Sequence, residues 1–206
     1  MSTAPAETVR WNRTAPAKTG AGCSSVQAAA AGSSSIRDIR ATDKNRRFNM
    51  MQWYRITKYD PAFRDNGIYT RDEWTSISDV GKTYNGVPFS MDEYVKVESD
   101  YIACVKSIMR HLGVTAFAIS ALEVYRSGTN IEDGGTVSDK RVDHIMKACL
   151  REDIWCVLLS RIMTVRFGYD YCMYVQCDIA QNEVVKIAAE YSLYAEPIAS
   201  DFFDDD

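Results

Sequence analysis

The chain has 206 residues, 46% of them hydrophobic and 25% charged, which suits one globular domain plus an appendage. Its formal charge of −4 conceals an uneven distribution, because eight of the 24 basic residues but only three of the 28 acidic ones lie in residues 1–49. The other 16 basic and 25 acidic residues give residues 50–206 a formal charge of −9. So acidic a domain would repel a phosphate backbone and attract a basic partner, which argues against nucleic-acid binding.

The six cysteines form no CxxC pair and show no Cys/His ligand spacing, and five of them lie within apolar strand or helix patterns. Reduced thiols in the core are therefore favoured over disulfides or metal ligands. No stretch approaches the ~18 apolar residues of a membrane span, and no secretory signal follows the N-terminus. We expect a cytoplasmic protein without membrane contact.

Residues 1–49 are rich in Ala, Ser, Thr and Gly and have no apolar period. Such a composition buries too little surface to offset chain entropy, so it predicts a disordered extension. Three explanations are open: a solvated tail, a transit peptide, or an upstream region that is not normally translated. The third is suggested by Arg46-Arg47, Phe48-Asn49 and Met50, which a ribosome-binding sequence, a spacer and a start codon would encode in frame.

The first elements of the folded part are expected from residue 52 onward. Residues 52–59 are β-branched and aromatic and end at Asp60-Pro61, which predicts a strand. Residues 60–89 carry turn signals but no regular pattern, and a connection of that length is often functional. Ser90 and Glu93 form a capping box before an apolar period of three and four residues that Gly113 ends, which predicts a helix.

Further along, residues 115–125 are almost continuously apolar, as a central strand covered on both faces would be. A loop at residues 127–135 should follow, and then a helix from about residue 138.

The last third of the chain predicts a hairpin and a helix. Residues 154–167 are expected to form one interrupted strand, and residues 168–170 turn the chain into a partner strand at 171–177. Asp178 is a candidate N-cap for a final helix at about 180–194.

This order, β-loop-α-β-α-β-β-α, suits right-handed parallel crossovers between the first three strands, with an antiparallel hairpin appended. We therefore expect a single α+β domain over residues 50–206, with a mixed four-stranded sheet and about three helices packed mainly on one face. The acidic end, residues 201–206, is expected to fray.

Catalytic signatures are not found in the sequence. Its two histidines, His111 and His144, lie in predicted helices, and the motifs GxSxG, HExxH, GxGxxG and GxxxxGK[ST] do not occur. Adjacent acids such as Asp72 and Glu73 are most often solvated surface charges. We expect a protein that is not an enzyme and has no catalytic residue, metal or cofactor. Spacing alone leaves open carboxylates from different elements that meet near residues 60–89.

Two strings combine aromatic and acidic residues: DEWTSISDVG at 72–81 and the turn around Tyr169-Asp170-Tyr171. One interpretation is packing, because buried aromatic side chains dominate core energetics. The other is a protein-binding face, because Tyr and Trp are enriched at interface centres. On the second interpretation the partner-binding residues are Asp72, Glu73, Trp74, Asp79, Tyr169, Asp170 and Tyr171.

Together with WYRITKYDP at 53–61 and FGYDYCMYV at 167–175, the 72–81 string resembles a family of small, mostly uncharacterised bacterial proteins that we associate with immunity proteins of polymorphic toxin systems. The resemblance covers residues 51 to about 195. It implies a cytosolic protein that stoichiometrically inhibits one cognate toxin, and a domain this acidic suits a basic toxin domain. The alternatives are an enzyme that uses carboxylates of the 60–89 loop and a structural or oligomer subunit. The oligomeric state is left open.

We predict that Met50 or Met51 is the working start of the protein. Intact-mass analysis of protein purified from its native source should then give the mass of a chain that begins at one of these methionines. A mass that includes residues 1–49 would contradict the start-site hypothesis, and cleavage within that segment would favour a transit peptide.

Overall fold

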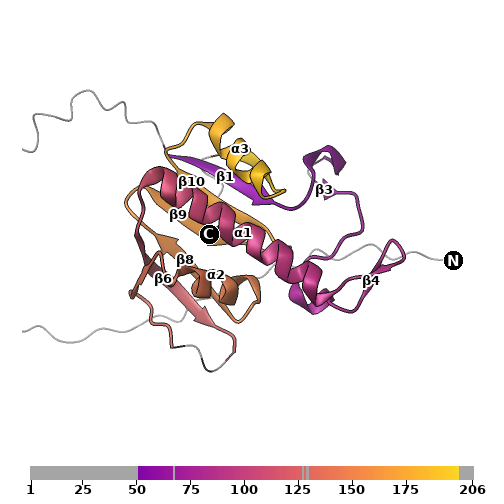
Figure 1. Cartoon of the computed structure of the whole chain (residues 1–206), viewed down its shortest axis with the longest axis horizontal. Helices are drawn as coiled ribbons and strands as arrows, with labels where there is room; N and C mark the ends of the chain where they lie inside the picture. The colour runs from indigo at the N-terminus through magenta and orange to yellow at the C-terminus, as the bar shows by residue number, and fades with distance from the viewer. Residues whose placement is uncertain (1–50, 67, 127, 129, 200–206) are drawn as a thin grey trace, which may run out of the picture. The chain divides into compact units, whose positions relative to one another are not determined.

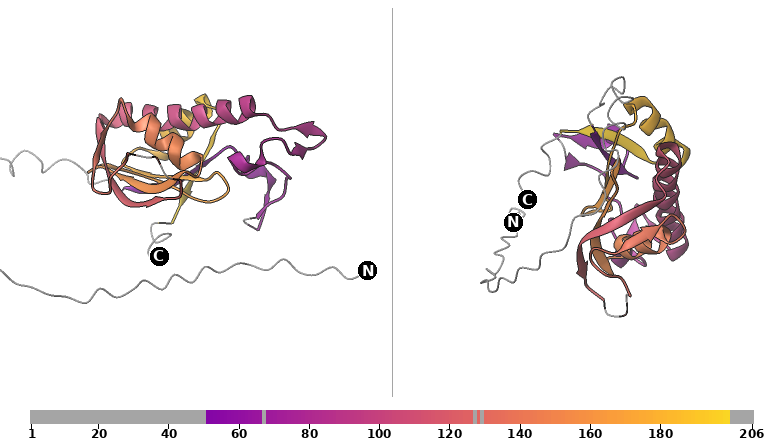
Figure 2. Two further views of the ribbon diagram at one scale, coloured as in Figure 1. Left: turned by 90° about the horizontal axis from the view of Figure 1, so that it is seen from below. Right: turned by 90° about the vertical axis from the view of Figure 1, so that its left-hand side faces the viewer.

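The computed structural model describes residues 51–66, 68–126, 128 and 130–199. The expectations of a disordered extension over residues 1–49 and of a frayed end at 201–206 lie outside the described residues. The described part is a single α+β domain, as expected, in which one large sheet carries three helices on one face (Figures 1 and 2).

The sheet has seven strands in the order β11-β1-β10-β9-β8-β6-β7. Each pair of neighbouring strands in it is antiparallel. The strands are β1 (Gln52–Thr57), β6 (Ala116–Val124), β7 (Thr136–Ser138), β8 (Ile154–Leu159), β9 (Met163–Phe167), β10 (Met173–Cys177) and β11 (Tyr194–Ile198).

The expected mixed sheet of four strands is therefore wrong in size and in direction. Residues 154–167 are two strands, because the chain reverses tightly at Ser160, whose N–H donates to the carbonyl of Met163 at 2.8 Å. The short edge strands β7 and β11 give little signal, and β11 contains a proline. The parallel crossovers are wrong because β1 pairs with β10 and β11 and not with β6.

The three helices are α1 (Met91–Leu112), α2 (Val142–Leu150) and α3 (Gln181–Glu190). α1 begins as predicted, with the Glu93 N–H donating to the Ser90 hydroxyl at 3.2 Å, and ends at Gly113 with φ of 70°. α2 starts later than predicted, because the residues just before it form β7 and a turn. α3 follows Ala180 without a side-chain cap, so the predicted cap at Asp178 is wrong.

The core lies between the helices and the sheet. In β6, Phe117 and Ile119 are buried against it while Ala118 between them is exposed, so this strand is covered on one face and not on both. A bulge between Ser120 and Glu123 then interrupts its pairing with β8.

One charge is fully buried beneath the helices. Glu98 on α1 accepts two hydrogen bonds from Arg151 at the end of α2, at 2.6 Å from Nε and 2.9 Å from Nη2. The five cysteines in the described part of the chain are free thiols, and the Sγ atoms of Cys149 and Cys156 lie 3.6 Å apart. No described helix has the length and apolar character needed to cross a membrane.

Candidate functional site

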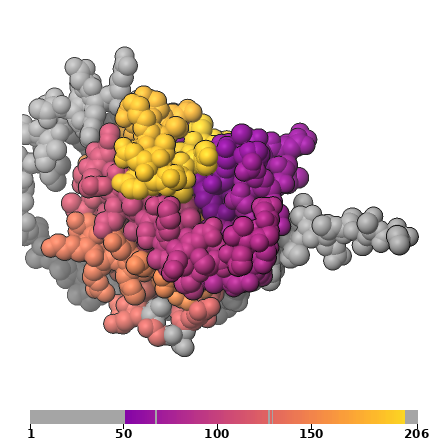
Figure 3. Space-filling view, turned by 45° about the vertical axis from the view of Figure 1, so that its right-hand side comes forward, coloured from indigo at the N-terminus to yellow at the C-terminus, as the bar shows by residue number. Residues whose placement is uncertain are grey.

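The connection between β1 and α1 is built from small pieces and not from one open loop. In the space-filling view, this connection and the start of α1 (indigo to magenta) form one end of the domain (Figure 3). The pieces are η1 (Pro61–Phe63), the hairpin of β2 (Arg64–Asp65) and β3 (Ile68–Tyr69), η2 (Ile77–Asp79), and the hairpin of β4 (Thr83–Tyr84) and β5 (Val87–Pro88).

Asp79 holds η2 together. Its Oδ2 accepts hydrogen bonds from the N–H groups of Thr75 at 2.7 Å and Ser76 at 3.3 Å, and its Oδ1 lies 2.6 Å from the Lys82 Nζ. Burial alone would raise the pKa of Asp79, but the Lys82 ammonium and the two N–H groups prevail and lower it to about 2. The carboxylate is buried, and its hydrogen bonds lie within the loop, so Asp79 stabilises the local fold of the loop.

An aromatic cluster joins the loop to the hairpin turn. Trp74 stacks on Phe89 with ring centroids 4.4 Å apart, and the Tyr171 ring meets Trp74 edge-on at 5.0 Å. The Tyr171 ring also contacts Tyr94 and Tyr101 of α1, at 5.6 and 5.1 Å. Trp74 and Tyr171 are each only 6% exposed. These two side chains are therefore part of the core, because their rings are enclosed by other aromatic residues.

Tyr101 links three segments by hydrogen bonds as well as by packing. Its hydroxyl donates to the backbone carbonyl of Tyr171 at 2.8 Å and accepts from the Lys58 N–H at 2.7 Å. Through this one buried side chain, α1 is tied both to the end of β1 and to the turn between β9 and β10.

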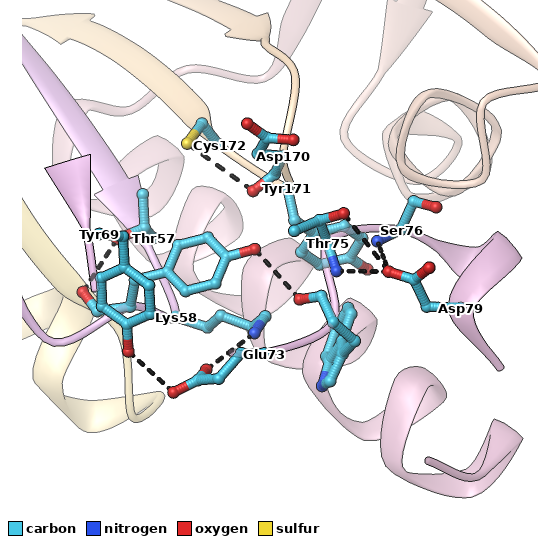
Figure 4. Close-up of polar contacts among 12 residues, drawn as sticks. Thr57, Lys58, Tyr69, Glu73, Thr75, Ser76, Asp79, Asp170, Tyr171 and Cys172 are labelled. Atoms are coloured by element: carbon cyan, nitrogen blue, oxygen red, sulfur yellow. Dashed lines mark hydrogen bonds and ion pairs between the residues drawn. The ribbon is translucent and has the colours of Figure 1, made fainter. Parts of the chain in front are cut away.

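Lys58 is a buried cation at the same junction (Figure 4). Its side chain is 8% exposed, with Nζ 3.0 Å from the Glu73 Oε2 and 4.1 and 4.2 Å from the ring centroids of Tyr59 and Trp74. Burial lowers the pKa of Lys58, and Glu73 opposes that shift. The other Glu73 oxygen accepts a hydrogen bond from the Tyr69 hydroxyl at 2.8 Å, so Glu73 fixes the start of the loop.

The turn itself has an unusual backbone. The Cys172 N–H donates to the Tyr169 carbonyl at 3.1 Å, and the two residues between them, Asp170 and Tyr171, have φ of 55° and 58°. Left-handed conformation is costly for a bulky residue, and the buried ring of Tyr171 holds it there. On the outer side of the turn, Asp170 is exposed and the Tyr169 side chain is 82% exposed.

The structure thus brings the two predicted segments together, but some of their predicted site residues are buried and others are exposed. Trp74, Asp79 and Tyr171 lie inside. Asp72, Tyr169 and Asp170 are exposed, and Glu73 is half-buried. Burial raises the pKa of Tyr59, and the nearby Cys172, Asp170 and Glu73 add to that shift, so the acid of the turn and the acid of the loop act on the same tyrosine.

Sequence reasoning missed Lys58 and Tyr101, which position these exposed groups. Lys58 stands within the WYRITKYDP string, and that was its only signal. Tyr101 fits the apolar period of its helix, but its two hydrogen bonds connect residues that are remote in sequence and cannot be read from helical spacing.

Two carboxylates of the loop form ion pairs with lysines. Glu73 is paired with Lys58 and Asp79 with Lys82. Within the described residues, no three or more His, Cys, Asp or Glu side chains are grouped so that they could hold a metal ion. No protein-family model matches the chain, and neither a curated protein nor a solved structure matches it. The resemblance to immunity proteins therefore stays a prediction.

The two buried tyrosines of the junction should respond differently to loss of the hydroxyl. Tyr101→Phe leaves the Lys58 N–H and the Tyr171 carbonyl without their partner and should lower the free energy of unfolding by about 2–4 kcal/mol. Tyr171→Phe should change it by less than about 1 kcal/mol, because the buried Tyr171 hydroxyl has no hydrogen-bond partner among the described residues. Urea denaturation of the two variants checks this, and equal losses would contradict it.

Asp79 should make the stability depend on pH in acid. Because its pKa in the folded protein is lowered to about 2, its stabilisation is complete above its ordinary pKa, near 4, and is lost as the pH falls toward 2. The difference in free energy of unfolding between the wild type and Asp79→Asn should shrink by on the order of 1–2 kcal/mol between about pH 5 and pH 2. Urea titrations across this range test it; a constant difference would mean that folding does not shift the pKa of Asp79.

Proposed function

We propose that this domain is a protein-binding inhibitor of the immunity type, which blocks a basic toxin domain through the surface where the 72–81 loop meets the 168–171 turn. One observation carries the proposal: Tyr169, 82% exposed, and Asp170 stand on a turn whose next residue, Tyr171, is locked into the core. The surface combines an exposed aromatic ring with the acids Asp72 and Asp170.

Rigidity of the turn supports this use. A partner that docks on an already ordered turn does not have to offset the cost of ordering it. The turn is fixed by the 2.8 Å hydrogen bond from Tyr101 and by the ring contacts of Tyr171 with Trp74, Tyr94 and Tyr101. A left-handed backbone at Asp170 and Tyr171 is also typical of positions retained for a purpose other than stability.

Charge supports a basic partner. Residues 50–206 carry a formal charge of −9, which accelerates encounter with a cationic surface at low ionic strength. Glu73 and Asp79 are already paired with Lys58 and Lys82. Asp72 and Asp170 are then the exposed acids that a basic partner would meet.

The proposal predicts that a neighbouring gene encodes a secreted protein whose C-terminal domain is toxic when expressed alone and harmless when this chain is co-expressed. Calorimetry with the purified pair should give one-to-one binding. Tyr169→Ala should raise Kd about tenfold or more, and Asp170→Lys should slow association and weaken its dependence on salt.

Glu132→Lys makes the same charge change on an exposed loop between β6 and β7 and serves as the matched control. It should leave Kd nearly unchanged, and all three variants should keep the thermal stability of the wild type. If co-expression of this chain does not neutralise the neighbouring toxin, the proposal is wrong. If Tyr169→Ala and Asp170→Lys leave binding intact, the partner binds at another surface.

A further inference from the structure

Two of the buried thiols face each other where α2 packs on the sheet. Cys149 lies near the end of α2, and Cys156 lies on β8, the strand that α2 contacts (Figure 1). Their Sγ atoms are 3.6 Å apart, and the two residues are 7% and 0% exposed. Among the residues that the structure describes, no other two cysteines form such a contact.

The backbone between the two cysteines holds their thiols in this contact. After Cys149 the chain turns tightly: the Glu152 N–H donates to the Cys149 carbonyl at 3.1 Å, and the Asp153 N–H donates to the Ala148 carbonyl at 2.9 Å. The chain then enters β8, which carries Cys156. Core packing alone accounts for two buried cysteines, because a free thiol behaves as a small apolar side chain. A fixed contact between two thiols also has a chemical consequence.

We propose that Cys149 and Cys156 are a redox pair, which closes to a disulfide on reaction with hydrogen peroxide and reopens on reaction with a dithiol. Cys149, the more accessible of the two, attacks one peroxide oxygen as the thiolate. The O–O bond breaks, and a sulfenic acid and one water form. The Cys156 sulfur then attacks the Cys149 sulfur, the S–O bond breaks and a second water leaves. The two thiols lose two electrons and two protons, which the peroxide gains.

The short distance favours the disulfide over further oxidation. A disulfide bond is about 2.05 Å long, so the two Sγ atoms have to approach by only about 1.5 Å from their present 3.6 Å. A second thiol already in contact can trap the sulfenic acid before another peroxide converts it to sulfinic acid. Neither cysteine belongs to the surface formed by the 72–81 loop and the 168–171 turn, so this inference does not rest on the proposed function.

The surroundings of Cys149 make the pair slow to react. The contact with Cys156 and then burial raise the pKa of Cys149, so little of this thiol is ionised at neutral pH. Because the thiolate is the reactive form, the pair should stay reduced on brief exposure to oxidant and close under sustained exposure. The rate of closure should increase as the pH rises above neutrality.

The bond would also act on α1. The carbonyl of Leu150, the residue after Cys149, accepts a hydrogen bond from the Tyr94 hydroxyl at 2.9 Å, and Arg151 holds the buried Glu98. Closure would therefore connect β8 covalently to the segment that carries these two contacts. It would also restrict the unfolded chain between the cysteines, so the oxidised domain should be more stable than the reduced one.

The direct test treats the reduced, folded, full-length chain with hydrogen peroxide and analyses the product by mass spectrometry. Trypsin cuts after Lys147, Arg151 and Arg161, so the disulfide would join peptide 148–151 to peptide 152–161. We expect this linked pair as the main cysteine product, and dithiothreitol should separate it. If both cysteines stay thiols under sustained exposure, pass to sulfinic acid, or link to other cysteines, the proposal is wrong.

A second test compares Cys156→Ala with Cys172→Ser, which removes the most exposed of the described cysteines and is the matched control. Peroxide should raise the Tm of the wild type and of Cys172→Ser by several degrees relative to its effect on Cys156→Ala. Each variant is compared with its own reduced form, so the effect of the substitution on packing cancels. An equal response of all three proteins would overturn the proposal.

Discussion

The contact of the Tyr171 ring with Trp74 and with the two tyrosines of α1 is the constraint on which the rest of the candidate site depends. It fixes a turn whose backbone alone would avoid the left-handed conformation, and it closes the long connection after β1 against the helix. The four rings come from three segments, the 72–81 loop, α1 and the turn, so they stabilise the arrangement only when these segments have assembled. The positions of the exposed residues Tyr169 and Asp170 therefore depend on this buried aromatic cluster.

Two buried charges reinforce the same end of the domain. Lys58 is enclosed by Glu73 and two aromatic rings, and Glu98 accepts hydrogen bonds from Nε and Nη2 of Arg151. Buried ion pairs add little net stability because desolvation offsets much of their attraction, but loss of one partner leaves a costly bare charge. Such pairs disfavour alternative packings of the connection, because any packing that separates the two partners leaves a buried charge without its counter-ion.

Local signals in the sequence were sufficient for α1, for β1 and for the hairpin of β9 and β10. The capping serine at 90 and Gly113 act within a few residues, so they can be read without knowing the fold. Strand direction cannot be read from local sequence, because it depends on which distant segments pair. β1, for example, pairs with β10 and β11, which come from the far end of the chain. β11 and β7 were missed because short edge strands need no alternating pattern.

The candidate site was predictable to the same extent. The composition of two strings was enough to place them together, and the Trp74–Tyr171 contact does so. The sequence could not predict which of their aromatic residues would be enclosed. Tyr169 and Tyr171 are chemically identical and close in sequence, yet a single left-handed turn directs one to solvent and the other into the core. Likewise Asp79 is buried among backbone N–H groups and the Lys82 ammonium, whereas Asp170 is exposed.

The position of β1 between β10 and β11 has a consequence for synthesis on the ribosome. Its hydrogen-bonded partners are more than a hundred residues downstream, as the Tyr54 bond to Ile179 and the Arg55 bond to Glu196 illustrate. The meander of β8, β9 and β10 can form as it emerges, but Trp53 and Tyr54 must wait without a partner strand until β10 is available, and the edge closes only with β11. During that interval the nascent chain presents an apolar, unpaired strand, which makes it a substrate for chaperones that bind extended hydrophobic segments.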